Sequence, residues 1–345
     1  MFAVLLALGG AYFFWRALTS PYKGFPEPTR LVQVRKGLRT SMILRHLQAE
    51  GVIRDEYVPL IYMKVARYGE SIKAGIYEFS KPESAADVLE KLIRGDVVLK
   101  SVTVREGLDH FAIARLFVAE HLGTQTEWDA AVANADLVRD IAPEATSLEG
   151  YLFPDTYKFS PGTNAHAIVK AMVANFRKHF AGEMAYITTG LDTHQTVILA
   201  SIVETEAKLP QERPLVASVY LNRLQRHMEL AADPTVIYAL KLAGRWDGNI
   251  HKWGLQIDSP YNTYRFRGLP PGPIANPGLA SLRAAAAPAK TPFLYFVAKH
   301  DGSHAFSTNL ADHNRNVLIY QKQWYRDPRA AAAQRAQPAQ PPTGR

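Results

Sequence analysis

Two glutamates, Glu204 and Glu206, end an apolar stretch at residues 196–208, TVILASIVETEAK. Ala, Leu and Ile without an internal Gly or Pro favour a helix, and apolar residues on all sides favour a buried one. At about 100° per residue, Glu204 shares a face with Ala200 and Ser201, whereas Glu206 points nearly the opposite way. The small residues on the Glu204 face leave room for another group.

A carboxylate in such a place has two interpretations. It forms an ion pair with a buried base, for which Arg213 and Arg223 are candidates further along the chain. Alternatively it performs acid–base chemistry, with a pKa raised by desolvation. The residue types alone leave both interpretations of Glu204 open.

Other segments carry groups suited to bind sugar. Residues 148–159, LEGYLFPDTYKF, combine aromatic and carboxylate side chains, and residues 261–264, YNTY, precede a rigid Pro- and Gly-rich loop at 268–278. Aromatic faces stack on sugar C–H groups, and carboxylates accept hydrogen bonds from hydroxyls. A core-packing strand is the alternative for residues 148–159. The candidate sugar-binding residues are Glu149, Tyr151, Asp155, Tyr157, Ser201, Tyr261, Asn262, Thr263 and Tyr264.

Several chemistries have no trace in the sequence. There is no Cys, which excludes thiolate catalysis and Cys-ligated metals, and no G-x-S-x-G, Walker A, G-x-G-x-x-G or H-E-x-x-H motif. His300 and His304 flank Asp301-Gly302, which indicates a turn rather than a metal site. We therefore expect neither a metal nor a cofactor. The net charge of +8 is spread without a basic block, so nucleic acid is not an expected partner.

The order of predicted elements indicates an α+β fold. Strand and helix patterns alternate through residues 31–121, and Asp233 is expected to cap a helix that Pro234 begins. The predicted organisation is a transmembrane anchor at 1–19, a linker at 20–30, a subdomain at 31–100, a connecting α/β unit at 101–147, a domain at 148–325 that carries the candidate catalytic and sugar-binding residues, and a disordered tail at 326–345. The strand, Lys36-Gly37 turn and helix that begin at Leu31 resemble the LysM fold, a module that binds cell-wall glycans, so residues 31–100 are predicted to be LysM-like; a structural spacer is the alternative.

The N-terminal segment reads as a single-pass membrane anchor. Phe2 to Trp15 is unbroken by charge, and Arg16 can snorkel to the interface. A cleavable signal peptide is the alternative, but the segment has no basic n-region and no A-x-A-like site. The positive charges that follow would place that side in the cytoplasm, so orientation depends on function.

Long motifs occur in a characteristic order from Leu148 onward. They are LEGYLFPDTY, ASIVETEA, ADPTVIYAL, YNTY, GLPPGPIANPG, and YFVAKHDGSHAFS followed by ADHN. With them the chain resembles the YceG-like endolytic murein transglycosylases (the MltG family) over about residues 31–323. Arg105-Glu106-Gly107 stands where the family usually has Pro-Glu-Gly.

The resemblance implies a bitopic inner-membrane protein with its catalytic domain in the periplasm. Such proteins cleave the MurNAc–GlcNAc β-1,4 bond within nascent peptidoglycan strands, leave 1,6-anhydro-MurNAc ends and so terminate glycan polymerisation. The catalytic glutamate of the family is matched to Glu204. The resemblance also implies contact with peptidoglycan synthases, the penicillin-binding proteins.

The chemistry of the reaction agrees with a single acid. The muramyl 6-hydroxyl replaces water as the attacking group, so the second carboxylate of a glycoside hydrolase is unnecessary. Two alternatives remain from the sequence. One is a muramidase-type hydrolase that uses Glu204 with Asp233 or Asp155, and the other is a membrane-anchored scaffold that binds peptidoglycan without cutting it.

Overall fold

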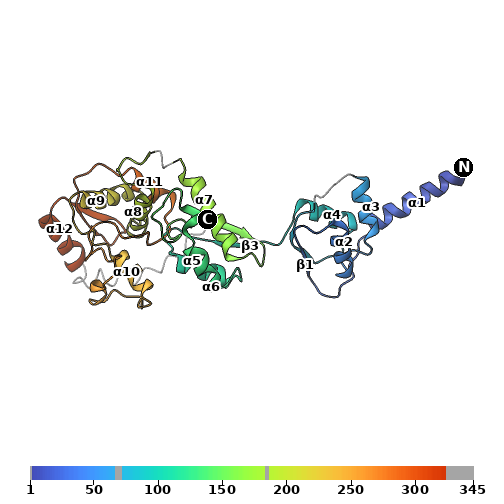
Figure 1. Cartoon of the computed structure of the whole chain (residues 1–345), viewed down its shortest axis with the longest axis horizontal. Helices are drawn as coiled ribbons and strands as arrows, with labels where there is room; N and C mark the ends of the chain where they lie inside the picture. The colour runs from blue at the N-terminus through green and yellow to red at the C-terminus, as the bar shows by residue number, and fades with distance from the viewer. Residues whose placement is uncertain (1, 67–71, 183–185, 324–345) are drawn as a thin grey trace. The chain divides into compact units, whose positions relative to one another are not determined.

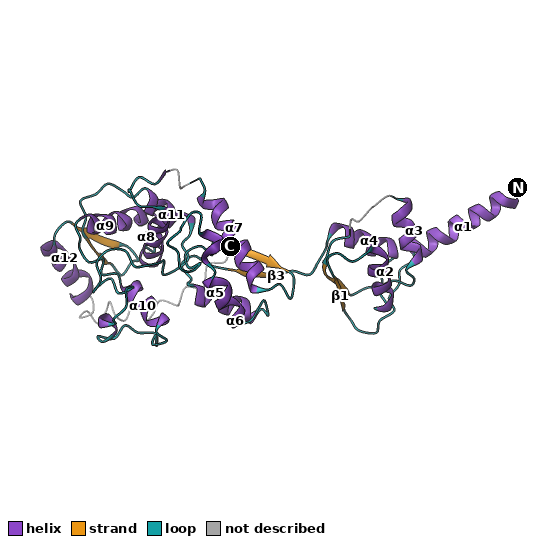
Figure 2. Cartoon of the chain, in the orientation of Figure 1, coloured by secondary structure: helices purple, strands orange, loops and turns teal. Residues whose placement is uncertain are grey.

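The structure is a computed structural model that describes residues 2–66, 72–182 and 186–323 (Figure 1). It divides into two compact units, residues 1–101 with 158–163 and residues 102–157 with 164–345. Both units combine helices with short strands, as an α+β protein should (Figure 2). The predicted tail at 326–345 lies outside the described residues, and the predicted domain boundaries remain predictions.

The first unit encloses its own apolar core around a two-stranded sheet. The two strands are antiparallel and place Val32 opposite Tyr77, both fully buried. Ser84 forms a capping box at the start of the last helix, and Gly95 ends that helix in the left-handed conformation at φ 77°. Its elements are α1 (Phe2–Thr19), β1 (Arg30–Val34), α2 (Thr40–Ala49), α3 (Tyr57–Val65), β2 (Gly75–Phe79) and α4 (Ala85–Arg94).

The helix α1 covers the segment predicted as a membrane anchor. Across the described ranges 2–66, 72–182 and 186–323, no helix combines the length and the apolar character needed to cross a membrane. The anchor predicted at residues 1–19 is therefore not confirmed. The LysM likeness of residues 31–100 also stays a prediction, although the strands and helices expected there are present.

The second unit is built around α8 (Thr193–Glu206), a helix that is buried over most of its length. Asp192 and Gln195 form its capping box, so it begins one turn before the predicted start at Thr196. Figure 1 shows α8 beside α9 and α11, and both helices pack against it and against each other.

The remaining elements complete the second unit. The strands β5 and β6 form the antiparallel hairpin expected around residues 293–306. The elements after α4 are β3 (Lys100–Thr103), α5 (His110–Ala119), α6 (Gln125–Ala133), β4 (Thr156–Phe159), α7 (Ala165–Phe180), α8, α9 (Arg213–Gln225), α10 (Asp233–Leu242), α11 (Leu279–Ala286), β5 (Tyr295–Ala298), β6 (His304–Ser307) and α12 (Leu310–Val317).

Candidate active site

Glu204 lies in a buried ion pair. Nη2 of Arg213 donates to its Oε1 at 3.0 Å, and the backbone N–H of Gly278 donates to its Oε2 at 3.0 Å. The Glu204 side chain is only 5% exposed. The ion pair with Arg213, one of the two interpretations that the sequence leaves open, is thus present, and the catalytic role of Glu204 stays a prediction.

A second carboxylate adjoins this pair. Oε2 of Glu106 lies 3.6 Å from Nη2 of Arg213. Burial and the negative charge of Glu204 raise the pKa of Glu106. Gly278 packs against Glu106 so closely that a Cβ at position 278 would fall 1.9 Å from its Oε1. The Arg105-Glu106-Gly107 segment therefore meets the end of the Pro-rich loop here.

The small residues on the Glu204 face of α8 are covered by the Pro-rich loop at 268–278. Ser201 Oγ accepts a hydrogen bond from the backbone N–H of Ile274 at 3.1 Å and donates to the carbonyl of Ile198. Ser201 is fully buried, as is Asn276. The small side chains on the Glu204 face of α8 thus do not leave open space. They allow the Pro-rich loop to pack closely against the helix.

Glu149 fixes the same loop from the other side. Its carboxylate accepts hydrogen bonds from Asn276 Nδ2 at 2.6 Å and Tyr238 Oη at 3.1 Å, and it lies 2.6 Å from His110 Nδ1. Burial opposes a charge on His110, but the bond to Glu149 and its negative charge raise the pKa of the imidazole overall. Since Glu149 is 1% exposed, it holds the loop in place and does not line an open surface.

The other predicted sugar-binding residues divide into buried and exposed groups. Tyr151 is fully buried and bonds to His194, and Tyr157 is buried and donates to the carbonyl of Phe153. Asn262 and Thr263 are buried as well. Asp155 is exposed, Tyr261 is half-buried and Tyr264 is 40% exposed. Most of the predicted set therefore supports the fold, and the structure does not gather it around one opening.

Glu206, the last residue of α8, lies in a different environment. It lines a cavity of about 440 Å³, and Tyr220 Oη donates to its Oε1 at 3.2 Å. Burial is the main cause that raises the pKa of Glu206 to about 7, and the negative charge of Asp233 adds to it. A carboxyl group with such a pKa is protonated in a large fraction of molecules near neutral pH, as a general acid requires.

Asp233 also differs from its prediction. The sequence predicted a helix cap, but α10 has Ala232 at the N-cap position and no side-chain capping bond, so that prediction was wrong. Asp233 instead accepts a hydrogen bond from Tyr264 Oη at 2.6 Å, and both residues line the Glu206 cavity. Arg223 is the cation of this cavity, and its guanidinium donates to the carbonyls of Leu294 and Leu230.

Two histidines of the Glu206 cavity were not identified from the sequence. His304 begins β6, and the carboxylate of Glu212 bonds both its backbone N–H and its Nδ1. His313 on α12 stacks on Tyr295 with ring centroids 5.2 Å apart. The residues between His300 and His304 predict a turn, and the structure has a turn at residues 300–301. Their spacing does not predict the contact between His304 and Glu212.

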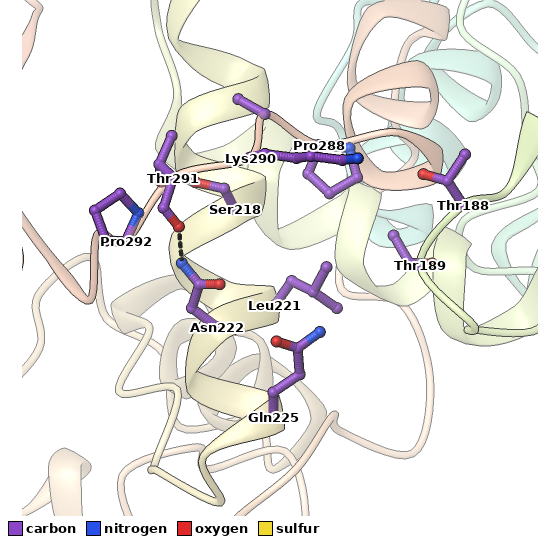
Figure 3. Close-up of a pocket in the computed structure, with 11 residues that line it drawn as sticks. Thr188, Thr189, Ser218, Leu221, Asn222, Gln225, Pro288, Lys290, Thr291 and Pro292 are labelled. Atoms are coloured by element: carbon purple, nitrogen blue, oxygen red, sulfur yellow. Dashed lines mark hydrogen bonds between the residues drawn. The ribbon is translucent and has the colours of Figure 1, made fainter.

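A second cavity of about 440 Å³ lies on the opposite face of α9 (Figure 3). Its wall includes Ser218 and Asn222, and Asn222 donates to the carbonyl of Thr291 at 2.8 Å. No carboxylate or imidazole is among the described residues that line it. This cavity therefore lacks the groups for acid–base chemistry, and we assign the candidate active site to the Glu206 cavity.

The Glu206 cavity combines a carboxyl group with a raised pKa, a second carboxylate, hydroxyl groups and imidazoles. This set suits proton transfer to and from a polyhydroxylated substrate. In the described parts of the chain, no group of three or more His, Asp or Glu side chains is arranged to hold a metal ion.

Comparison with known proteins places the chain in a family. Residues 32–318 match the model of the YceG-like family, to which this chain belongs. It is 32% identical to the endolytic murein transglycosylase of Bacillus subtilis over 329 residues, which are 90% of each chain. It is 30% identical to the enzyme of the same name from Streptococcus pneumoniae over 92% of this chain and 63% of that one.

A solved structure agrees with the family assignment. The crystal structure of a YceG-like protein from Listeria monocytogenes matches with a TM-score of 0.56 and 32% sequence identity. The match covers 84% of this chain and 99% of that chain. The resemblance inferred from the motifs is therefore confirmed.

Proposed function

We propose that this protein is an endolytic peptidoglycan lytic transglycosylase. It cleaves the MurNAc–GlcNAc β-1,4 bond within nascent glycan strands and leaves 1,6-anhydro-MurNAc ends. Family membership and the named activity of the Bacillus and Streptococcus relatives support the reaction class. The observation in this chain that carries the proposal is Glu206, whose carboxyl group lines an open cavity and has a pKa raised to about 7.

Glu206 is the proton donor in this proposal. As the bond from C1 of MurNAc to the glycosidic oxygen breaks, the carboxyl group transfers its proton to that oxygen. The C6 hydroxyl of the same MurNAc attacks C1, so no water enters the product. The attack is intramolecular and gains from proximity. Tyr220 positions the acid through its hydrogen bond to Oε1.

Glu204 has a positioning role in this proposal, although the sequence predicted it as the acid. One oxygen of its carboxylate, Oε1, already accepts a hydrogen bond from Arg213. Its second oxygen holds the backbone N–H of Gly278 and so anchors the Pro-rich loop. Glu204 as the acid remains the competing assignment.

The products of uncrosslinked glycan strands test both assignments. The full-length protein should release fragments with anhydro-muramyl ends, identified by mass spectrometry. Glu206→Gln should abolish these fragments, whereas Glu204→Gln should keep measurable activity wherever it stays folded. Full activity of Glu206→Gln would refute the assignment of the acid. Inactive Glu204→Gln with a native fold would instead favour Glu204.

The same measurement separates the alternative functions. Asp233 lies near Glu206 and lowers the tendency of that acid to ionise, so a hydrolase that uses this pair is the enzyme alternative. Hydrolysis would leave a reducing end and a product heavier by one water molecule. A scaffold would bind glycan without releasing any fragment.

The location and partners are part of the proposal. Because nascent peptidoglycan lies outside the cytoplasm, we propose that the catalytic unit works in the periplasm beside the inner membrane, in contact with peptidoglycan synthases. A reporter fused after Thr29 that is active only in the cytoplasm would refute the location. Failure to co-purify with any penicillin-binding protein after crosslinking in cells would contradict the contact.

A further inference from the structure

One face of α3 in the first unit is apolar although it is exposed to solvent. Tyr57, Ile61 and Val65 lie four residues apart on that face and are 65%, 49% and 77% exposed. The helix also carries Pro59 and Met63, which are buried. A surface helix ordinarily presents polar side chains on its solvent side. The face formed by Tyr57, Ile61 and Val65, the outer face of α3, is therefore unusual for a helix that meets only water.

The neighbouring helix α4 shows the ordinary arrangement. Its exposed positions include the charged residues Asp87, Glu90 and Arg94, whereas Val88 and Leu92 are buried. Since α3 and α4 pack against each other in the same unit, the apolar composition of the outer face is particular to α3. Single exposed apolar residues are common on proteins, but contiguous apolar patches mark interaction surfaces.

A second exposed apolar surface adjoins α3. The helix α1 packs against α3 (Figure 1), and its side chains Leu5, Leu8, Phe13 and Trp15 are each more than half exposed. Trp15 lies near the end of α1 that joins the rest of the unit. Trp and Tyr are enriched at the level of lipid headgroups, where their amphipathic rings meet both water and hydrocarbon. The two helices together therefore carry the side chains of a surface that meets lipid.

The end of α1 is fixed to the unit by buried and backbone contacts. Leu18 is buried in the last turn of the helix. The backbones of Tyr22 and Glu83 then form an antiparallel bridge, and the N–H of Gly24 donates to the carbonyl of Gly51 at 2.8 Å. These contacts leave no free linker between α1 and the core of the unit. A membrane that binds α1 will therefore meet α3 in a defined position.

The charges on and around these helices favour an anionic partner. The sequence of α3 contains Lys64 and no Asp or Glu, and the sequence of α1 contains Arg16 and no Asp or Glu. Arg54, which precedes α3, is exposed as well. Of the two acids before the helix, Glu56 is buried and pairs with Arg45. Basic residues beside an apolar face attract anionic lipid headgroups.

We propose that the outer face of α3 rests on a bilayer that contains anionic lipid, beside α1. Ile61 and Val65 lie about 5–10 Å into the boundary between headgroups and acyl chains, as the apolar faces of surface helices do. Lys64 stays among the headgroups. The contact is independent of the reaction proposed for the second unit. It does more than tether the chain, because it determines which side of the first unit faces the membrane.

A fluorescent probe on the outer face of α3 tests the contact in the full-length chain. The chain contains no Cys, so Ile61→Cys supplies a single site for a thiol-reactive, environment-sensitive fluorophore. The labelled protein is reconstituted into vesicles of phosphatidylcholine and phosphatidylglycerol. The emission should shift to shorter wavelength, and lipids with a spin label on the acyl chain should quench it. A spin label near the headgroup should quench more strongly than one near the end of the chain, because surface helices lie only about 5–10 Å deep.

The matched control is the same fluorophore on Gln33→Cys. Gln33 is exposed on β1, and β1 lies on the side of the unit away from α1 (Figure 1). Its emission should not shift, and quenching by spin-labelled lipid should be at least about twofold weaker than at position 61, because only the face on the lipid is immersed. Tyr57→Cys and Val65→Cys repeat the measurement on the outer face in case the label at position 61 disturbs the helix.

A change of charge on α3 tests the preference for anionic lipid. Lys64→Glu, made in the labelled Ile61→Cys chain, should reduce the quenching in vesicles that contain phosphatidylglycerol, because it places a negative charge beside anionic headgroups. Lys36→Glu makes the same change at an exposed residue beyond β1 and should leave the quenching unchanged. Melting temperatures of both variants should stay near that of the labelled parent, since both side chains are exposed.

Three outcomes would overturn the proposal. In the first, the labelled chain does not float with the vesicles. In the second, it floats, but the probe at position 61 is quenched no more than the probe at position 33, which would leave the outer face in water. In the third, the emission shifts without quenching by lipid, which would mean that a second copy of the chain or another protein segment covers this face. The vesicles contain no glycan, so these results are separate from those that test the proposed function.

Discussion

Changing each glutamate of α8 to Gln should shift the stability of the fold in opposite directions. Glu204→Gln leaves Arg213 buried without its main partner, and removing one member of a buried ion pair costs about 3–5 kcal/mol. Glu106 remains 3.6 Å from Arg213 and can replace part of the lost attraction. We therefore expect a loss at the lower end, about 3 kcal/mol.

Glu206→Gln should have the opposite effect at alkaline pH. In the wild type, burial and Asp233 raise the pKa of Glu206 from 4.5 to about 7. A carboxyl pKa that is raised by folding means that stability is fully present below about pH 4.5 and is lost as the pH rises through about 7. At 1.36 kcal/mol per unit, the penalty near pH 8 is about 3 kcal/mol at most. Gln carries no charge, so we expect a gain of about 1–3 kcal/mol near pH 8 and almost none near pH 4.5.

Thermal unfolding followed by circular dichroism measures both effects. A free-energy change of 1 kcal/mol shifts the melting temperature of a domain of this size by about 2–4 °C. The control is Glu90→Gln, since Glu90 pairs with Arg94 on the surface and should have little effect. The reasoning fails if Glu204→Gln is inactive but melts like the wild type, or if Glu206→Gln melts at a lower temperature near pH 8.

Three further results are expected. Wild-type activity should decline as the pH rises through about 7. Asp233→Asn should move this decline to lower pH, because the loss of a nearby negative charge lowers the pKa of Glu206. Digests across a pH range measure this, and a decline at the same pH in the variant would contradict it. Tyr264→Phe should reduce kcat by about twofold to tenfold, because it removes the 2.6 Å hydrogen bond from Tyr264 Oη to Asp233. An unchanged kcat would mean that this hydrogen bond does not affect the site. Glu149→Gln should lower the free energy of unfolding, measured in urea, by about 1–3 kcal/mol, because the buried donors around Glu149 lose a charged acceptor. Unchanged stability would show that the hydrogen bonds of Glu149 do not hold the Pro-rich loop in place.

Local patterns predicted the secondary structure well. The helix that Ser84 begins and Gly95 ends follows its capping and termination signals, and the hairpin at 295–307 follows its Asp301-Gly302 turn. Such features depend on neighbours within a few residues, which the sequence displays directly. The helical phase that separates Glu204 from Glu206 was also predictable.

The site was harder to predict because its environment comes from distant segments. Small residues at Ala200 and Ser201 suggested open space, but they equally permit the Pro-rich loop to approach α8 closely. The pairing of Glu204 with Arg213, and of His304 with Glu212 across 92 positions, depends on the tertiary fold. The polar residues of the motifs therefore identified the segments that form the site. They did not separate the residues that hold the Pro-rich loop from the residues that line the Glu206 cavity.

The position of Glu206 at the end of α8 has a consequence for how easily its acidity can be altered. Aligned peptide dipoles leave about half a negative charge at a helix C-terminus, which disfavours a second negative charge there. This contribution comes from the main chain, so no side-chain substitution around the cavity removes it. Burial and Asp233 also favour the proton on Glu206, but both of these depend on the side chains around the cavity, whereas the main-chain contribution does not.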